Sequence, residues 1–156
     1  MSIYPIIKMG HPTLRKVASP VAPSDIDRPE MHTLIAHMVE TLHDAGGIGL
    51  AAPQIDRPIQ LAIIEVPGGP SRYGEIEAVP LTVFFNPVLT VVDPAEAGYW
   101  EGCLSVPGLR GFVHRPQHVR VDYMDIAGEQ ASIDLKGFLA TVVQHEFDHL
   151  AGTLYV

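Results

Sequence analysis

The run His145-Glu146-Phe147-Asp148-His149 constrains this chain more than any other feature, because it has the pattern of a metal site that carries its own base. The apolar spacing around it predicts a helix that starts near Gly137. In a helix, histidines at positions i and i+4 lie on one face, so both imidazoles can bind the same cation. Glu146 is then placed to reach a water on that cation. The alternative interpretation is a helix with two surface histidines and an acid.

The chain contains one cysteine, Cys103, which is a candidate for a third metal ligand. A lone cysteine cannot form an intrachain disulfide, so the sequence argues against a secreted protein that depends on disulfides. A buried structural thiol is the simpler interpretation of such a residue. Together with the two histidines, however, one thiolate makes three protein ligands. That number is typical of a catalytic metal whose fourth position stays open.

The chain resembles the peptide deformylases, a family that carries three motifs in a fixed order. All of them are present: GIGLAAPQ at Gly47–Gln54, EGCLS at Glu101–Ser105 and QHEFDHLAG at Gln144–Gly152. The resemblance is specific, because the motifs are spread over nearly the entire chain. The zincin peptidases share only the H-E-x-x-H part. Their third ligand is ordinarily an acid or a histidine further along the chain, and only Leu150–Val156 follows here.

The resemblance implies hydrolysis of the formyl amide of N-formylmethionyl peptides, with release of formate. It implies one divalent metal, Fe2+ in the native enzyme, with Zn2+, Ni2+ or Co2+ able to occupy the same ligands. The implied metal ligands are Cys103, His145 and His149. Glu146 would move the proton of the attacking water, while Gln54 and the backbone N–H of Leu104 would hold the oxyanion. Neither Glu146 nor Gln54 is needed to hold a metal, which argues against a non-catalytic binding module with a structural zinc.

The resemblance also implies a substrate site, at positions Gly47, Ile48, Gly49, Tyr99, Gly102, Arg110, Phe138 and Val142. An apolar pocket would receive the methionine side chain, Ile48 and Gly102 would pair with an extended peptide backbone, and Arg110 would flank the peptide path. Spacing alone fits core packing of Phe138 and Val142 equally well. Two further positions match a pair that supports the ligand helix, with an ordinary surface ion pair as the alternative: Arg115 and Asp148.

The 156-residue chain is expected to form one catalytic domain, residues 1–156, without the longer charged C-terminal helix of many bacterial relatives. A helix is predicted between Asp27, its expected N-cap, and Gly46-Gly47. Strands are predicted at 59–66, 81–85, 88–92, 119–126 and 133–135, with a loop beginning at 67–70. This order predicts an α+β fold, with antiparallel or mixed β-sheets around a central C-terminal helix that carries the H-E-x-x-H motif. Leu154–Val156 is expected to pack back as a short strand or sheet edge.

The formal net charge of -8, without any run of Lys or Arg, argues against direct binding of nucleic acid. No apolar stretch is long enough for a membrane span, and the first residues lack the pattern of a signal peptide. A cytoplasmic location is therefore expected. The expected partners are N-formylmethionyl nascent peptides, with weak and salt-sensitive association with the ribosome.

Overall fold

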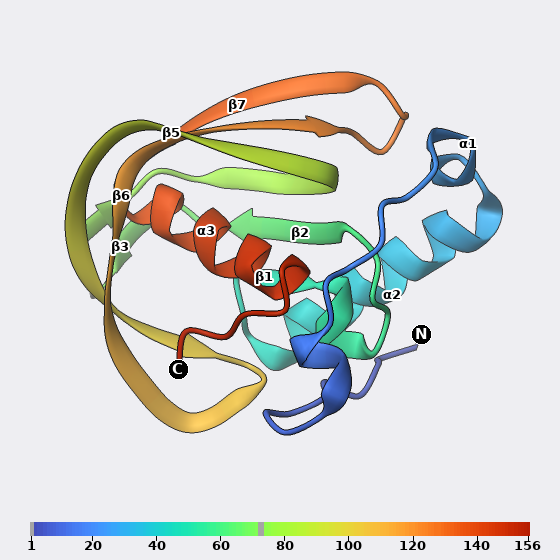
Figure 1. Ribbon diagram of the computed structural model, residues 1–156, viewed down its shortest axis with the longest axis horizontal. Coiled ribbons are helices and arrows are strands. Elements are labelled where there is room, and N and C mark those ends of the chain that lie inside the picture. The colour runs from blue at the N-terminus through green and yellow to red at the C-terminus, as the bar shows by residue number, and fades with distance from the viewer. Residues whose placement is uncertain (1, 72–73) are drawn as a thin grey trace.

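The computed structural model describes residues 2–71 and 74–156, and its long strands curve around one helix (Figure 1). The strands are β1 Gly49–Ala51, β2 Leu61–Val66, β3 Gly69–Ser71, β4 Gly74–Ile76, β5 Val79–Cys103, β6 Val106–Met124 and β7 Gln130–Lys136. The helices are α1 Pro23–Ile26, α2 Pro29–Ala45 and α3 Phe138–Leu150, with 3-10 turns η1 at Pro12–Arg15 and η2 at Ala52–Ile55. One sheet has the order β1-β2-β5-β6-β7 with antiparallel pairing, and β3 pairs with β4 as a hairpin. The predicted α+β class and the central C-terminal helix are confirmed.

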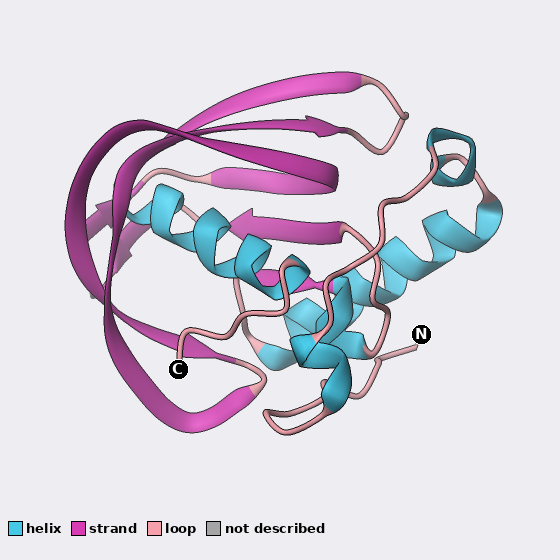
Figure 2. Ribbon diagram, in the orientation of Figure 1, coloured by secondary structure: helices cyan, strands magenta, loops and turns pink. Residues whose placement is uncertain are grey.

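The middle of the large sheet is covered on both faces, by α2 on one side and by α3 on the other (Figure 2). On the α2 side, Met38 and Leu42 pack with Leu61 and Ile63 of β2. The α3 side buries a second set of side chains: Ile64, Phe84, Val119, Val121, Ala140 and Val143. Because β2 faces apolar neighbours on both sides, its sequence is an almost continuous apolar run without polar alternation. Helix α3 is thereby held inside the curve of the sheet.

The largest difference from the prediction is β5, a strand of 25 residues where the sequence predicts two short strands, 81–85 and 88–92. The chain does not turn between them. The register with β6 shifts between Phe85 and Val88, and Asn86 takes a positive φ of 49°. The Asn86 side chain also bonds both backbone groups of Val21, at 2.8 Å each. Asn86 therefore interrupts the pairing without ending the strand, because β5 pairs with β6 both before it, at Phe85, and after it, from Val88 onward.

The limits of the two long helices follow the prediction with one exception. Helix α2 ends at Gly46 with a left-handed φ of 67°, and α3 begins directly after Gly137. The exception is the start of α2, where Arg28 is the N-cap and Asp27 instead ends the short α1. A proline at the first helical position explains this start, since it loses no helical hydrogen bond there.

The short strands β1, β3 and β4 are absent from the prediction, because three residues give no periodic signal. Two of them, β3 and β4, lie in the segment predicted to begin as a loop at 67–70. Residues 72–73 of that segment lie outside the described residues.

The C-terminal segment after α3 folds back onto the domain. Leu154 is buried, which confirms the predicted packing. The prediction of a strand is wrong, because the segment has no regular secondary structure in the described chain. Instead, the Tyr155 hydroxyl donates a hydrogen bond to the carbonyl of Leu109 at 2.9 Å. None of the helices in residues 2–71 and 74–156 has the length and apolar character needed to cross a membrane.

Candidate metal centre and active site

The three predicted ligands meet at one point, where α3 passes the end of β5. One ligand atom from each of Cys103, His145 and His149 can be chosen so that all lie within 4.8 Å of one another. The Cys103 Sγ is 3.4 Å from Nε2 of His149. A tetrahedral ion with a metal–sulfur bond of about 2.3 Å and a metal–nitrogen bond of about 2.0 Å separates its ligands by about 3.5 Å. The donor set and its spacing therefore fit a single metal ion.

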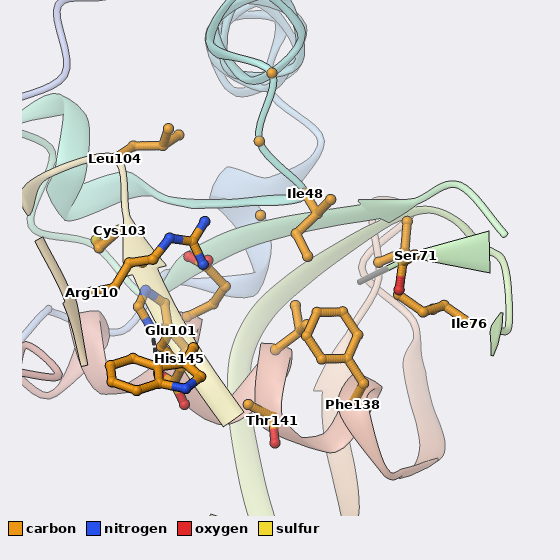
Figure 3. A pocket seen from close by; sticks show the side chains of 18 of the residues that line it. Ile48, Ser71, Ile76, Glu101, Cys103, Leu104, Arg110, Phe138, Thr141 and His145 are labelled. Atoms are coloured by element: carbon orange, nitrogen blue, oxygen red, sulfur yellow. Dashed lines mark hydrogen bonds and ion pairs between the residues drawn. The ribbon is translucent and has the colours of Figure 1, made fainter. Parts of the chain in front are cut away.

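A buried carboxylate, Glu101, fixes the position of one ligand. Its Oε1 lies 2.9 Å from Nδ1 of His145 (Figure 3). Arg115 donates to its two oxygens at 2.7 and 3.0 Å. Arg115 also donates to Asp148 on α3, at 2.8 Å, so the predicted Arg115–Asp148 pair is present. The sequence analysis did not predict the role of Glu101, the carboxylate that lies between Arg115 and His145. Its sequence signal is the spacing from Cys103, because residues i and i+2 of a strand point to the same face.

The pKa values of the two histidines move in opposite directions. Burial opposes charge on His145, but hydrogen bonds with Cys103 and Glu101 outweigh it and raise its pKa to about 10. Burial, and then the charge of His145, lower the pKa of His149 to about 3. Burial also opposes charge on Glu101, but its bonds to His145 and Arg115 lower its pKa. A metal ion competes with the proton on His145, because histidine binds metal as the neutral imidazole.

Glu146 is the residue next to the ligand His145 in α3. Its side chain is buried, and Oε2 finds no hydrogen-bond partner in residues 2–71 and 74–156. Burial raises the pKa of Glu146 to about 7, so the carboxyl group can both take and give a proton near neutral pH. Gly49 of β1 makes room for it, since a Cβ there would lie 2.7 Å from Oε1 of Glu146. The resemblance placed Gly49 in the substrate site, but the nearest atoms to a Cβ there belong to Glu146.

The Gln54 side chain is held in one orientation. Its Oε1 accepts a hydrogen bond from the backbone N–H of Ala51 at 2.9 Å. Its Nε2 therefore faces Ser105 Oγ at 3.2 Å and Cys103 Sγ at 3.6 Å. Leu104 follows Cys103 in the turn after β5, and the carbonyl of Leu104 accepts from Nζ of Lys8 at 3.0 Å. The two expected oxyanion donors thus both lie next to Cys103.

A cavity of about 750 Å³ opens beside these residues. It is lined by the following predicted site residues: Gly47, Ile48, Gly49, Gln54, Gly102, Cys103, Leu104, Arg110, Phe138, Val142, His145 and Glu146. Ile48 and Phe138 both point into it (Figure 3). Two predicted site residues lie behind this surface: His149 and Tyr99, whose ring packs edge-on against Phe138 at 5.6 Å. The lining residues that the sequence analysis missed include Trp100, Leu109, Thr141 and several residues of the segment that forms β3 and β4.

Comparisons with known proteins agree over nearly the whole chain. A family model described as polypeptide deformylase matches residues 3–156. Peptide deformylase 2 of Pseudomonas syringae pv. tomato is 48% identical over 150 residues, which is 96% of this chain and 83% of that protein. Peptide deformylase 1 of Bordetella pertussis is 48% identical over 153 residues, covering 98% and 85%.

The fold also has close counterparts among solved structures. The class I type b peptide deformylase of Acinetobacter baumannii, with Met-ala-ser bound, gives a TM-score of 0.92 at 32% identity, covering 99% of this chain and 98% of that one. The peptide deformylase of Thermotoga maritima gives a TM-score of 0.84 at 34% identity, covering 99% and 95%.

Proposed function

Because this chain belongs to the polypeptide deformylase family, we propose that Cys103, His145 and His149 hold the ion at which it hydrolyses the formyl amide. The chain is an enzyme that removes the N-formyl group from nascent peptides. The observation that carries the proposed site is the convergence of three ligand atoms within 4.8 Å, beside a buried carboxyl group.

Each remaining residue of the site has a proposed task. A divalent ion held there would act as a Lewis acid on the formyl carbonyl and would lower the pKa of water toward about 7. Glu146 takes the proton from the attacking water and delivers it to the leaving nitrogen, and a pKa of about 7 suits both steps. Gln54 Nε2 and the Leu104 N–H donate to the developing oxyanion. Glu101 keeps Nδ1 of His145 occupied, which leaves Nε2 for the ion.

The substrate proposal is an N-formylmethionyl nascent peptide, with its methionine side chain in the apolar part of the cavity. Ile48, Phe138 and Val142 line that part, and Tyr99 supports Phe138 from behind. The cavity beside them is also lined by Gly47, Gly49, Gly102 and Arg110, along which the proposed peptide extends. A peptide, Met-ala-ser, is bound to the Acinetobacter baumannii relative.

The proposed native metal is Fe2+, with Zn2+, Ni2+ or Co2+ as substitutes. One thiolate and two imidazoles accept any of these ions, so the choice depends on function and availability. The only thiolate of the chain is a ligand in this proposal, and an Fe2+ centre beside it oxidises readily, whereas Zn2+ has no redox chemistry. Iron-loaded protein should therefore lose activity under peroxide faster than zinc-loaded protein, and equal decay of the two forms would contradict iron as the sensitive metal.

The proposed setting is the cytoplasm, where residues 1–156 act as a single catalytic domain on chains that leave the ribosome. A net charge of -8 favours only weak contact with ribosomes, and it opposes direct nucleic-acid binding. No membrane association is proposed. Co-sedimentation with ribosomes at rising salt measures this contact. Tight binding that does not change with salt would show that a specific surface carries out the docking.

The deciding experiment measures formate release from formyl-Met-Ala-Ser by protein loaded with Fe2+ in the absence of oxygen. Wild-type protein should turn over, and Cys103→Ala should lose both bound metal and activity. A control with the same kind of truncation is Val88→Ala, since Val88 is 62% exposed on the same strand. Full metal content and activity in Cys103→Ala would refute the proposed ligand set.

A further inference from the structure

The N-terminal segment contacts both parts of the chain that carry the expected oxyanion donors. The backbone N–H of Ile7 donates a hydrogen bond to the carbonyl of Gln54 at 2.8 Å. Two positions later, the N–H of Met9 donates to the carbonyl of Ser105, also at 2.8 Å. A short stretch of chain thus connects η2 with the turn that follows β5, although these elements lie far apart in the sequence. We refer to residues 7–9 as the N-terminal clamp.

Lys8, the middle residue of the N-terminal clamp, binds the same turn through its side chain. Its Nζ donates to the carbonyl of Leu104 at 3.0 Å. Because the donor is charged, this bond is stronger than one between neutral groups. Lys16 is a second exposed lysine of the N-terminal segment, and within residues 2–71 and 74–156 its side chain makes no hydrogen bond or ion pair. The contact of Lys8 is therefore specific to its position.

Ser105 links the N-terminal clamp to the Gln54 side chain as well as to its backbone. Ser105 is buried, and its Oγ accepts a hydrogen bond from Nε2 of Gln54 at 3.2 Å. Its carbonyl is the group to which Met9 donates. The N-terminal clamp therefore bonds the backbone of Gln54 and, through Ser105, the residue that contacts the Gln54 amide group.

We propose that the N-terminal clamp positions the two oxyanion donors, the Gln54 amide and the Leu104 N–H, with Lys8 as a positioning residue. This rests on the proposed function, because both donors belong to it. Residues 7–9 are not among those that line the cavity, so they act through the donors and not on the substrate. Oxyanion donors are effective when they are fixed in advance where charge develops, so displacing them slows the chemical step more than it weakens substrate binding.

The first kinetic test removes the bond of Lys8. Lys8→Met keeps an unbranched side chain without a donor, and kcat for formyl-Met-Ala-Ser should fall about threefold to tenfold, less than the roughly 10²-fold typical of a full 1 Å misplacement. KM should stay near the wild-type value, because the lost interaction matters only in the transition state. Lys8→Arg should restore most of kcat, and Lys16→Met should have no effect. An unchanged kcat in Lys8→Met, or an equal loss in Lys16→Met, overturns the proposal.

The second variant removes a backbone donor at a position that accepts proline. The His11 N–H donates to the Lys8 carbonyl at 3.0 Å, and Gly10 has a φ of 105°, which is the pattern of a type II turn. Met9 is the second residue of this turn, where proline is favoured. Its side chain is 49% exposed, so Met9→Pro removes the bond to Ser105 with little loss of packing.

Met9→Pro also tests whether the N-terminal clamp acts through Gln54. In wild-type protein it should lower kcat by about tenfold, again with KM nearly unchanged. In a Gln54→Ala background the further loss should be clearly smaller, since contacting residues of one network are not additive. Equal losses in the two backgrounds would overturn the proposal, because the effect would then not pass through the Gln54 amide.

A measurement that does not depend on turnover separates this proposal from the proposed function. Two-dimensional 1H–15N NMR spectra of zinc-loaded protein report on the backbone amide of Leu104 and the side-chain amide of Gln54. The first resonance should move in Lys8→Met, the second in Met9→Pro, and neither in Lys16→Met. If both resonances stay in place in the two clamp variants, the proposal is overturned even where kcat falls. Displaced resonances in a protein that releases no formate would instead refute the proposed catalysis and support the clamp.

Discussion

The cavity has one wall formed by the ends of β5 and β6 together with α3 (Figure 3). A second wall is formed by residues 66–71 and by the β3–β4 hairpin, in which Ile76 of β4 lines the cavity. On the first wall, Glu101, Arg115, Asp148 and His145 form a continuous set of short polar contacts between strands and helix. On the second wall, the residues other than Val66 and Ile76 are mostly glycine, proline and exposed polar residues. The proposed metal ligands lie on this first wall, where Glu101 and Arg115 are buried and paired with each other. Two buried atoms of the same wall, Oε2 of Glu146 and Nδ1 of His149, have no hydrogen-bond partner among residues 2–71 and 74–156.

The difference has a physical reason. A buried charge destabilises the fold unless each of its hydrogen bonds is made, so partners from several elements must hold it in one position. That same constraint gives metal ligands the fixed geometry that catalysis requires. A short exposed hairpin needs only its own backbone pairing. Substitutions on the first wall should therefore have large and coupled effects, and those on the second wall small and local ones.

Removing the proton carrier gives the largest expected effect. Glu146→Gln keeps the shape of the side chain beside Gly49 but cannot accept the proton, so kcat should fall by about 10²–10⁴-fold. Metal content, measured by atomic absorption, should stay near that of wild-type protein. A parallel loss of metal would mean that Glu146 is a structural part of the centre.

Gly49→Ala tests whether the first wall tolerates a small displacement. The added methyl group would lie 2.7 Å from Oε1 of Glu146, so the carboxylate must move. A shift near 1 Å in a catalytic group can lower the rate by about 10²-fold, and we expect a kcat loss of up to this size. Gly74→Ala on the second wall is the comparison variant. Alanine is strained there by the positive φ of 96°, but its Cβ would have no neighbour within 4 Å. Equal rate losses in both variants would remove the distinction between the walls.

Glu101→Gln should weaken metal binding by about 10- to 100-fold, because His145 loses the carboxylate that orients it. It should also change the pH dependence of stability. The pKa of Glu101 lies below its ordinary 4.5, because its bonds to His145 and Arg115 outweigh its burial. The ionised group therefore stabilises the fold above pH 4.5, and this contribution is lost as the pH falls through the lower folded pKa. Urea unfolding from pH 7 to pH 3 should show a smaller loss in the variant; identical acid profiles would contradict the prediction.

Tyr155→Phe removes a contact that joins the C-terminal segment to the first wall. The lost bond from its hydroxyl to the Leu109 carbonyl should lower the free energy of unfolding by about 1 kcal/mol at most, since the bond is exposed. The ring itself lies 5.8 Å from that of His145 and is kept. Tyr155→Ala should therefore also raise the rate of metal release, measured with a chromogenic chelator. Equal metal release in Phe and Ala variants would mean that the ring does not support His145.

The smallest effect is expected on the second wall. Ser71→Ala removes the exposed bond from Ser71 Oγ to the Gly74 carbonyl, which should change unfolding free energy by less than about 0.5 kcal/mol. Thermal unfolding and kcat should both remain near wild type. A loss comparable to that of Glu101→Gln would show that this wall is as tightly coupled as the other.

Much of the site could be predicted from sequence because its signals are local. The i and i+4 positions of His145 and His149 fix one helix face, and Gly137 and Gly46 mark helix ends through backbone conformations that glycine adopts readily. Cys103, Gln54 and Leu104 were identified from the motifs of a known family, since spacing alone left their roles open. Glu101 was missed, although it lies within one of those motifs.

Only the tertiary structure determined which distant residues come into contact at the site. The contacts of Cys103 with Gln54 and His149, and of Glu101 with His145, join residues separated by 49, 46 and 44 positions. The sequence around each of them is compatible with several neighbours, and the register of β5 on β6 and the burial of α3 select one. The same pairing carries β5 through Asn86, where the sequence predicts a break between two strands. Backbone geometry over a few residues thus determined the ends of the two long helices, while burial and strand register, which act between distant segments, determined the extent of β5 and the contacts of the site.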